Sequence, residues 1–181
     1  MNLKSICYRV ASSYKYNPSL IGEISLQNPF HHLARGIFIK DNKVLLAKAT
    51  GYTNTFLPGG HIEFGESAKD ALIREIEEEL GISSTVDSFL GVVEHKWEKK
   101  GIVHCEINQV FAAHSDELIT GVNPKSSESH LEFFWCDAVE LDNKNLQPYP
   151  FRSLIKSYLN GNKDIWWEST LTTEIDDSNR S

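Results

Sequence analysis

The chain has 181 residues, of which 40% are hydrophobic, so it can bury one sizeable core and a single domain is expected. Its formal net charge of −7 argues against a broad basic face for a nucleic-acid polymer, but it leaves nucleotide-sized ligands open. The three cysteines, Cys7, Cys105 and Cys136, lack metal-ligand spacing, and no apolar run approaches membrane-spanning length; together these features favour a cytoplasmic protein that does not enter a membrane.

The first 32 residues have a mixed pattern, and we expect them to form an N-terminal extension packed on the domain. Two short strands are predicted next, at residues 33–40 and 43–49, on either side of the turn sequence KDNK. Residues 51–67 are rich in glycine and helix-breaking residues, which predicts a loop that contains a short strand.

The rest of the chain alternates between helical and extended patterns. From Ser67 to Leu80, apolar residues recur at helical spacing, and Gly81 stands where a helix C-cap belongs. Strands are predicted at 88–97 and 101–113, joined by a hairpin, and at 131–141, after a loop at 117–130. A closing helix is predicted at 150–161. The expected organisation is one α/β domain over residues 33–171, followed by a frayed acidic tail at 172–181.

The predicted helix carries four glutamates within the sequence LIREIEEELG. At about 100° per residue, and with Glu75 at zero, Glu78 lies at about −60° and Glu79 at about +40°, whereas Glu77 lies at about 200°. Three carboxylates therefore share one arc beside the apolar stripe. Like charges at this spacing destabilise a helix by a few tenths of a kcal/mol per pair, but a bound Mg²⁺ or Mn²⁺ would reverse that balance. Taken alone, the segment is also typical of a solvated acidic surface.

The flanking residues distinguish between these readings. From Gly60 the sequence is GHIEFGESAKDALIREIEEELGI, which places Glu66, Arg74 and Gly81 at fixed distances from the helix glutamates. This stretch resembles the Nudix box of the MutT-like Nudix hydrolases, G-x5-E-x7-R-E-U-x-E-E-x-G-U, at every specified position. A looser resemblance extends from Leu33 to about residue 158. It implies an α/β/α sandwich with a mixed sheet between the two helices.

The resemblance also implies a function. Nudix hydrolases cleave a phosphoanhydride bond of a nucleoside diphosphate linked to another moiety, by attack of a metal-activated water. Carried onto this chain, the family pattern implies that the Mg²⁺ or Mn²⁺ ligands are Glu75, Glu78, Glu79 and the main-chain carbonyl of Gly59. Glu66 and Arg74 resemble the structural pair that ties the loop to the helix and orients the carboxylates; the alternative is a surface ion pair of little energetic value.

The general base is not fixed by the resemblance. One candidate is Glu128 in the loop before the late strand, with Glu132 as a second choice; the helix residue Glu78 is a third. For Glu128, an ordinary solvated loop carboxylate is an equally good description. Replacing Glu128 by Gln and measuring turnover tests its role.

Substrate contacts are also open. Arg35 can meet a substrate phosphate or form a strand-edge ion pair, and Trp97 or Phe134 can stack on a base or pack in the core. The histidines, including His31 and His104, show no ligand spacing. Between residues 83 and 123 there is no proline or tyrosine, and the run SQPWPFPQS is absent, which weakens ADP-ribose, diadenosine-polyphosphate and NADH assignments. A small nucleotide is the expected partner, and the N-terminal extension can cover the pocket or mediate a homodimer.

Two alternatives of different classes accompany the hydrolase hypothesis. The first is a catalytically silent Nudix-fold nucleotide sensor or regulator, although such domains often lose box glutamates and this chain retains them. The second is an isomerase acting on an isoprenoid diphosphate, which requires a catalytic cysteine. Cys105 lies among apolar residues in a predicted strand, as an inert core thiol would.

Overall fold

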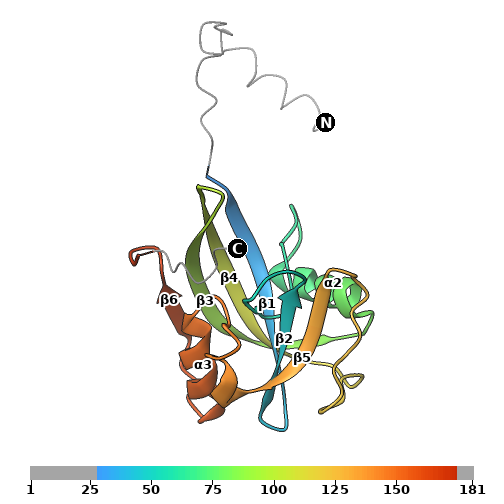
Figure 1. Ribbon diagram of the computed structural model, residues 1–181. Coiled ribbons are helices and arrows are strands. Elements are labelled where there is room, and N and C mark those ends of the chain that lie inside the picture. Colours follow the sequence, from blue (N-terminus) through green and yellow to red (C-terminus); the bar gives the residue numbers. More distant parts are fainter. Residues whose placement is uncertain (1–27, 175–181) are drawn as a thin grey trace, which may run out of the picture.

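The computed structural model describes residues 28–174 (Figure 1). Most of the expected N-terminal extension, residues 1–27, and the tail residues 175–181 lie outside the described residues. The described elements, in chain order, are β1 (Phe30–Lys40), β2 (Lys43–Ala49), α2 (Ala68–Leu80), β3 (Thr85–Lys99), β4 (Ile102–His114), β5 (Leu131–Asp137), the 3-10 turn η3 (Ala138–Glu140), α3 (Pro150–Leu159) and β6 (Trp166–Ser169).

The strands form one six-stranded mixed sheet in the order β5-β2-β1-β4-β3-β6. The pairs β1–β4 and β3–β6 are parallel, and the other neighbours are antiparallel. The long β3–β4 hairpin turns at Lys100 and Gly101, both of which have a positive φ. The parallel β1–β4 pair at the centre of the order brings together two segments that are separated by about 70 residues. This pairing positions the residues of the site described below.

The core has two parts because successive strand residues face opposite sides of the sheet. On β1, Ala34 and Phe38 join Leu72 and Ile76 of α2 in one buried cluster. The intervening Ile37 belongs to a second cluster, which contains residues of α3. Figure 1 shows α2 and α3 on either side of the strands, so the predicted α/β/α sandwich with a mixed sheet is confirmed.

Helix α2 begins and ends where local signals predict. The Ser67 hydroxyl accepts a hydrogen bond from the Asp70 amide at 3.1 Å, as an N-cap does. Gly81 has a φ of 67°, and its amide donates to the carbonyl of Glu77. Leu72, Ile76 and Leu80 are buried, in agreement with the predicted apolar arc, whereas Ala68 and Ile73 are partly buried.

Several boundaries differ from the sequence-based expectation. Strand β1 starts at Phe30 because that residue already pairs with Cys105 of β4. Strand β5 ends at Asp137, opposite the first residue of β2, so the expected continuation to residue 141 has no partner and forms η3 instead. The loop at 51–67 contains isolated bridges at Thr55, Phe56 and His61 rather than a named strand. Strand β6 was not predicted. Within residues 28–174, no helix has the length and apolar character needed to cross a bilayer.

Candidate active site

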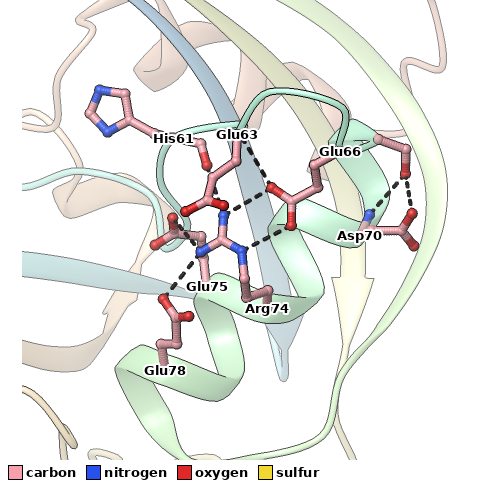
Figure 2. A network of polar contacts seen from close by, with 8 residues as sticks. His61, Glu63, Glu66, Asp70, Arg74, Glu75 and Glu78 are labelled. Atoms are coloured by element: carbon pink, nitrogen blue, oxygen red, sulfur yellow. Dashed lines mark hydrogen bonds and ion pairs between the residues drawn. The ribbon is translucent and has the colours of Figure 1, made fainter. Parts of the chain in front are cut away.

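Arg74 connects helix α2 to the loop that precedes it (Figure 2). Its guanidinium donates to both carboxylate oxygens of Glu66, at 2.9 and 3.0 Å, and to the main-chain carbonyl of His61 at 3.0 Å. The remaining nitrogen donates to Glu75 at 3.0 Å and to Glu78 at 3.1 Å. The hydrogen bond from Arg74 holds the pKa of Glu66 below its ordinary value. The expected Glu66–Arg74 pair is therefore formed, and the same arginine also holds two helix glutamates.

Glu79 is a buried carboxylate at the junction of helix and loop. Only 5% of the residue is exposed, and one of its oxygens accepts a hydrogen bond from the Gly59 amide at 3.1 Å. Burial raises the pKa of Glu79 from 4.5 to about 7, and the charges of Glu75 and Glu128 add to this rise. The Gly59 amide and the Arg35 charge act in the opposite direction but do not cancel it.

Gly59 and Gly60 allow the loop to approach both β1 and the helix. The Gly60 carbonyl accepts from the Ala34 amide at 2.9 Å, which fastens the loop to β1. A Cβ on Gly59, whose φ is +113°, would lie 2.3 Å from the Ala34 carbonyl oxygen. A Cβ on Gly60 would lie 2.4 Å from a carboxylate oxygen of Glu75. The two glycines therefore have different partners: one clears a strand backbone and the other clears a side chain of the site.

The donor set fits a hard divalent cation. Glu75, Glu78, Glu79 and the Gly59 carbonyl offer only oxygen atoms, the ligands that Mg²⁺ prefers. Among residues 28–174, no three acidic, histidine or cysteine side chains converge tightly enough to hold a metal as they stand. Arginine side chains contact three of the four groups: Arg74 holds Glu75 and Glu78, and Arg35 holds the Gly59 carbonyl. Glu79, buried with a raised pKa, has the surroundings of a carboxylate that a cation would stabilise.

The candidate bases occupy different places. The loop that carries Glu128 is fastened to the end of α2, because the Ser127 amide donates to the Glu79 carbonyl at 2.8 Å. The Glu128 carboxylate is half-buried, lies 3.3 Å from a ring nitrogen of His130, and acts electrostatically on Glu79. Glu132 is exposed on β5 and lines a separate, smaller cavity. Of Glu128 and Glu132, only Glu128 acts electrostatically on the buried Glu79.

A cavity of about 580 Å³, a volume suited to a small ligand, is lined by Arg35 but by none of the predicted cation ligands. Trp97 lines it, whereas Phe134 lines the smaller cavity near Lys144, whose ammonium lies 5.9 Å from the Phe134 ring centroid. The two aromatic residues proposed as base-stacking partners are therefore not in one pocket. The residues of the large cavity combine aromatic and charged groups, among them Arg35, Tyr52, Phe56, Trp97, Lys99 and Glu106.

Arg35 points from β1 into the space between this cavity and the loop. Its guanidinium donates to the carbonyls of Gly59 and Leu57, the latter at 3.1 Å. Its Nε donates to the Asn108 side chain at 3.4 Å, and the guanidinium carbon lies 5.4 Å from the Phe56 ring centroid. These contacts place Arg35 between the predicted cation ligands and the cavity rather than in an ion pair at a strand edge.

Three histidines form a hydrogen-bonded chain that the sequence did not reveal. His31 contacts His61 at 2.9 Å through one ring nitrogen and His104 at 3.0 Å through the other. His104 also stacks on Trp97, with ring centroids 4.0 Å apart. Burial and the neighbouring rings lower the pKa of His31 and of His104. Their sequence spacing carried no signal, because the parallel β1–β4 pairing brings His31 and His104 together and a bridge from Leu33 places His61 beside them.

Comparisons with known proteins agree with this geometry. An ADP-ribose pyrophosphatase of Methanocaldococcus jannaschii is 48% identical over 60 residues, which cover 32% of this chain and 36% of that protein. A CTP pyrophosphohydrolase of Escherichia coli is 31% identical over 62% of this chain and 79% of its own length. An isopentenyl-diphosphate Delta-isomerase of Cereibacter sphaeroides is 27% identical over 74% of this chain and 79% of its own.

A solved structure gives the same fold. The MutT protein from Methanosarcina mazei superposes with a TM-score of 0.56 and 25% identity, over 77% of this chain and all of that one. The model of the NUDIX domain matches residues 30–155, a span that contains β1, the loop with Gly59, helix α2 and most of α3. With the box residues in contact and the sandwich formed around them, the chain belongs to the NUDIX family.

Proposed function

We propose that the protein is a Mg²⁺-dependent pyrophosphohydrolase that cleaves a phosphoanhydride bond of a nucleoside diphosphate linked to another moiety. The observation that carries this proposal is the buried Glu79 carboxylate, which accepts a hydrogen bond from the Gly59 amide, while Arg35 contacts the Gly59 carbonyl and lines a cavity of about 580 Å³. Burying a carboxylate is costly unless a cation compensates it. The hydrolase names of two relatives support the same reaction class.

The proposed cation ligands are Glu75, Glu78, Glu79 and the carbonyl of Gly59. When bound, a divalent cation neutralises charge that develops on phosphate oxygens and lowers the pKa of a water molecule. Arg74 keeps the carboxylates of Glu75 and Glu78 on one side of the helix, because a single guanidinium nitrogen contacts both. Mn²⁺ has similar ligand preferences and is expected to replace Mg²⁺.

The remaining groups bind the substrate and move the proton. Lys99 and Arg35 border the cavity, so we propose that they attract the diphosphate. Trp97 and Phe56 offer ring faces to a nucleobase. Glu128, fastened near Glu79 by its loop, is the proposed acceptor of the proton from the attacking water.

The test is a phosphate-release screen over nucleoside triphosphates, nucleotide sugars and dinucleotides, with and without Mg²⁺. We expect Mg²⁺-dependent hydrolysis of at least one class, its loss in Glu79→Gln, and a fall of about 10²-fold or more in kcat for Glu128→Gln. Near-wild-type turnover of Glu128→Gln would assign the base to another residue. Absence of metal-dependent hydrolysis across the screen would refute the hydrolase proposal and favour a nucleotide sensor.

Two substitutions, Trp97→Ala and Phe134→Ala, test which aromatic residue stacks on the base. Trp97→Ala is expected to raise KM by about 5- to 150-fold, because a stacked base contributes about 1–3 kcal/mol. Phe134→Ala removes an aromatic ring of the second cavity and is expected to leave KM near its wild-type value. Equal effects of the two substitutions on KM would contradict this assignment. Melting temperatures of both variants separate the loss of a contact from general destabilisation.

The isomerase similarity defines a second candidate, and a cysteine distinguishes it. Cys105 does not line the large cavity, although its neighbour Glu106 does. Cys136 is buried, and burial raises the pKa of its thiol to about 11, which disfavours the reactive thiolate. We expect no isomerisation of isopentenyl diphosphate, and Cys105→Ser should retain hydrolysis. Isomerase activity that is lost in Cys105→Ser would reverse the choice.

A further inference from the structure

Arg35 contacts the same carbonyl oxygen that we propose as a cation ligand. Its Nη1 donates both to the Gly59 carbonyl and, at 3.1 Å, to the Leu57 carbonyl. The loop that presents these carbonyls also places the Gly59 amide on the Glu79 carboxylate. A guanidinium and a divalent cation would therefore compete for one oxygen beside one buried carboxylate.

The charges around Glu79 give Arg35 a role in the metal-free protein. The Gly59 amide donates to the buried Glu79 carboxylate, and the carbonyl of the same residue accepts from the Arg35 guanidinium. Arg35 therefore places a positive charge at the loop residue that contacts Glu79. A divalent cation at the Gly59 carbonyl would take over that role and repel the guanidinium at short range.

Arg35 also contacts a residue that borders the cavity. Its Nε contacts the Asn108 side-chain oxygen, and its guanidinium lies against the ring of Phe56, which borders the cavity. Asn108 is held in this orientation because its amide nitrogen donates to Glu106 at 2.9 Å and to the Val93 carbonyl at 3.2 Å. Because Arg35 itself lines the cavity, a guanidinium released from the Gly59 carbonyl has space to turn towards it.

We propose that Arg35 holds the place of the divalent cation at the Gly59 carbonyl in the metal-free protein and turns into the cavity to bind a substrate phosphate when the cation displaces it. Arg35 is then a positioning residue that couples the two halves of the site. Displacing Arg35 lowers the affinity of the protein for the cation. The released Arg35 then raises its affinity for the diphosphate. The inference rests on the cation ligands of the proposed function, but it concerns binding rather than hydrolysis.

The decisive experiment measures Mn²⁺ binding in the absence of nucleotide, by isothermal titration and by the electron paramagnetic resonance signal of free Mn²⁺. Arg35→Gln removes the competing charge and is expected to bind Mn²⁺ about tenfold more tightly than the wild type, within the usual range of coupling between sites. Lys43→Gln is the matched control, because it removes one positive charge from a partly buried pair with Asp137. It should bind Mn²⁺ as the wild type does.

The opposite result would overturn the proposal. Unchanged or weaker Mn²⁺ binding by Arg35→Gln would mean that Arg35 supports the loop and does not compete with the cation. The proposal further requires that Arg35→Gln bind a non-hydrolysable nucleoside diphosphate analogue more weakly in the presence of Mn²⁺. A variant that gains affinity for both ligands would contradict the turn towards the cavity.

A measurement on the unaltered protein covers the case in which Arg35→Gln does not fold. In a ¹⁵N spectrum of arginine Nε–H groups, Arg35 is identified by the signal that disappears in Arg35→Lys. Its resonance is expected to shift when Mg²⁺ is added without nucleotide, and an unmoved resonance at saturating Mg²⁺ would refute the displacement. If no substrate is hydrolysed but Arg35 still responds to the cation in the binding and resonance measurements, the enzyme assignment alone is refuted. Hydrolysis without that response would refute this inference alone.

Discussion

The buried carboxylate of Glu79 has a cost for the metal-free protein that can be measured directly. Its pKa of about 7, against an ordinary value of 4.5, means that the folded protein disfavours the ionised form. Because each pKa unit corresponds to about 1.4 kcal/mol, the cost in free energy of folding at neutral to alkaline pH is about 3 kcal/mol. Replacing Glu79 by Gln keeps the size of the side chain and an oxygen for the Gly59 amide, and it removes the charge.

The pH range of this effect follows from the two pKa values. Below about pH 4.5 the carboxyl is protonated in both the folded and the unfolded chain, so it contributes no difference. Between pH 4.5 and about 7 the unfolded chain has released its proton while the folded protein retains it, so a rise in pH favours unfolding. Above about 7 both forms are ionised and the cost stays constant.

The assay is urea unfolding of wild type and Glu79→Gln, with a chelator present, at pH 4.5 and at pH 8. The variant should gain about 3 kcal/mol in free energy of unfolding relative to the wild type between the two conditions, and titrating groups that do not interact with Glu79 cancel in the comparison. Glu77→Gln, an exposed residue of the same helix, should show no such change. Added Mg²⁺ should stabilise the wild type and not Glu79→Gln. A difference independent of pH would refute the assigned burial cost.

Three further substitutions test the loop and the arginine. Arg74→Lys loses the two-pronged contact with Glu66 and should cost about 2 kcal/mol, seen as a melting temperature lower by about 6 °C; an unchanged melting temperature would mean the pair contributes nothing. Gly60→Ala displaces only the flexible end of the Glu75 side chain, so the free energy of unfolding measured in urea should change by less than about 1 kcal/mol. The Mn²⁺ affinity of this variant, measured by titration, should fall about tenfold. Gly59→Ala places its Cβ against strand backbone at a positive φ and should lose more than about 3 kcal/mol; stability equal to that of Gly60→Ala would contradict the distinction.

Local features of the fold were predictable because their causes are local. The N-cap at Ser67, the C-cap at Gly81 and the buried stripe between them depend on residues within a few positions of one another. The four-residue strand β6 depends instead on parallel pairing with β3, about 75 residues earlier in the chain. One trace of it exists in the sequence: a Cβ on Gly91 would lie 2.1 Å from the carbonyl oxygen of Trp166. A glycine within a strand signals close approach but does not identify the partner.

The residues that line the cavity could not be predicted either, because long-range strand pairing brings them together. Trp97 and Phe134 are both aromatic residues on strands, and sequence alone treats them alike. The structure separates them, because β3 and β5 lie on opposite sides of β1 in the sheet order and border different cavities. The contact of Arg35 with the Gly59 carbonyl was equally hidden, since it depends on how the loop runs along β1. Long-range pairing therefore decides the substrate contacts, and no local pattern encodes it.

The burial of the helix glutamates depends partly on local and partly on long-range structure. The helical angle of each glutamate predicts their order of burial. The apolar arc runs from about 60° to 160°, so Glu79 at about 40° is nearest to it, Glu75 at zero is next, and Glu78 at about −60° is farthest. In the structure Glu79 is buried, Glu75 is half-buried and Glu78 is exposed. Helical angle thus predicts the order of burial, although the depth comes from the loop that closes over Glu79. This gradient implies different contributions: Glu79 carries the folding cost, whereas exposed Glu78 is free to change partners between Arg74 and a cation.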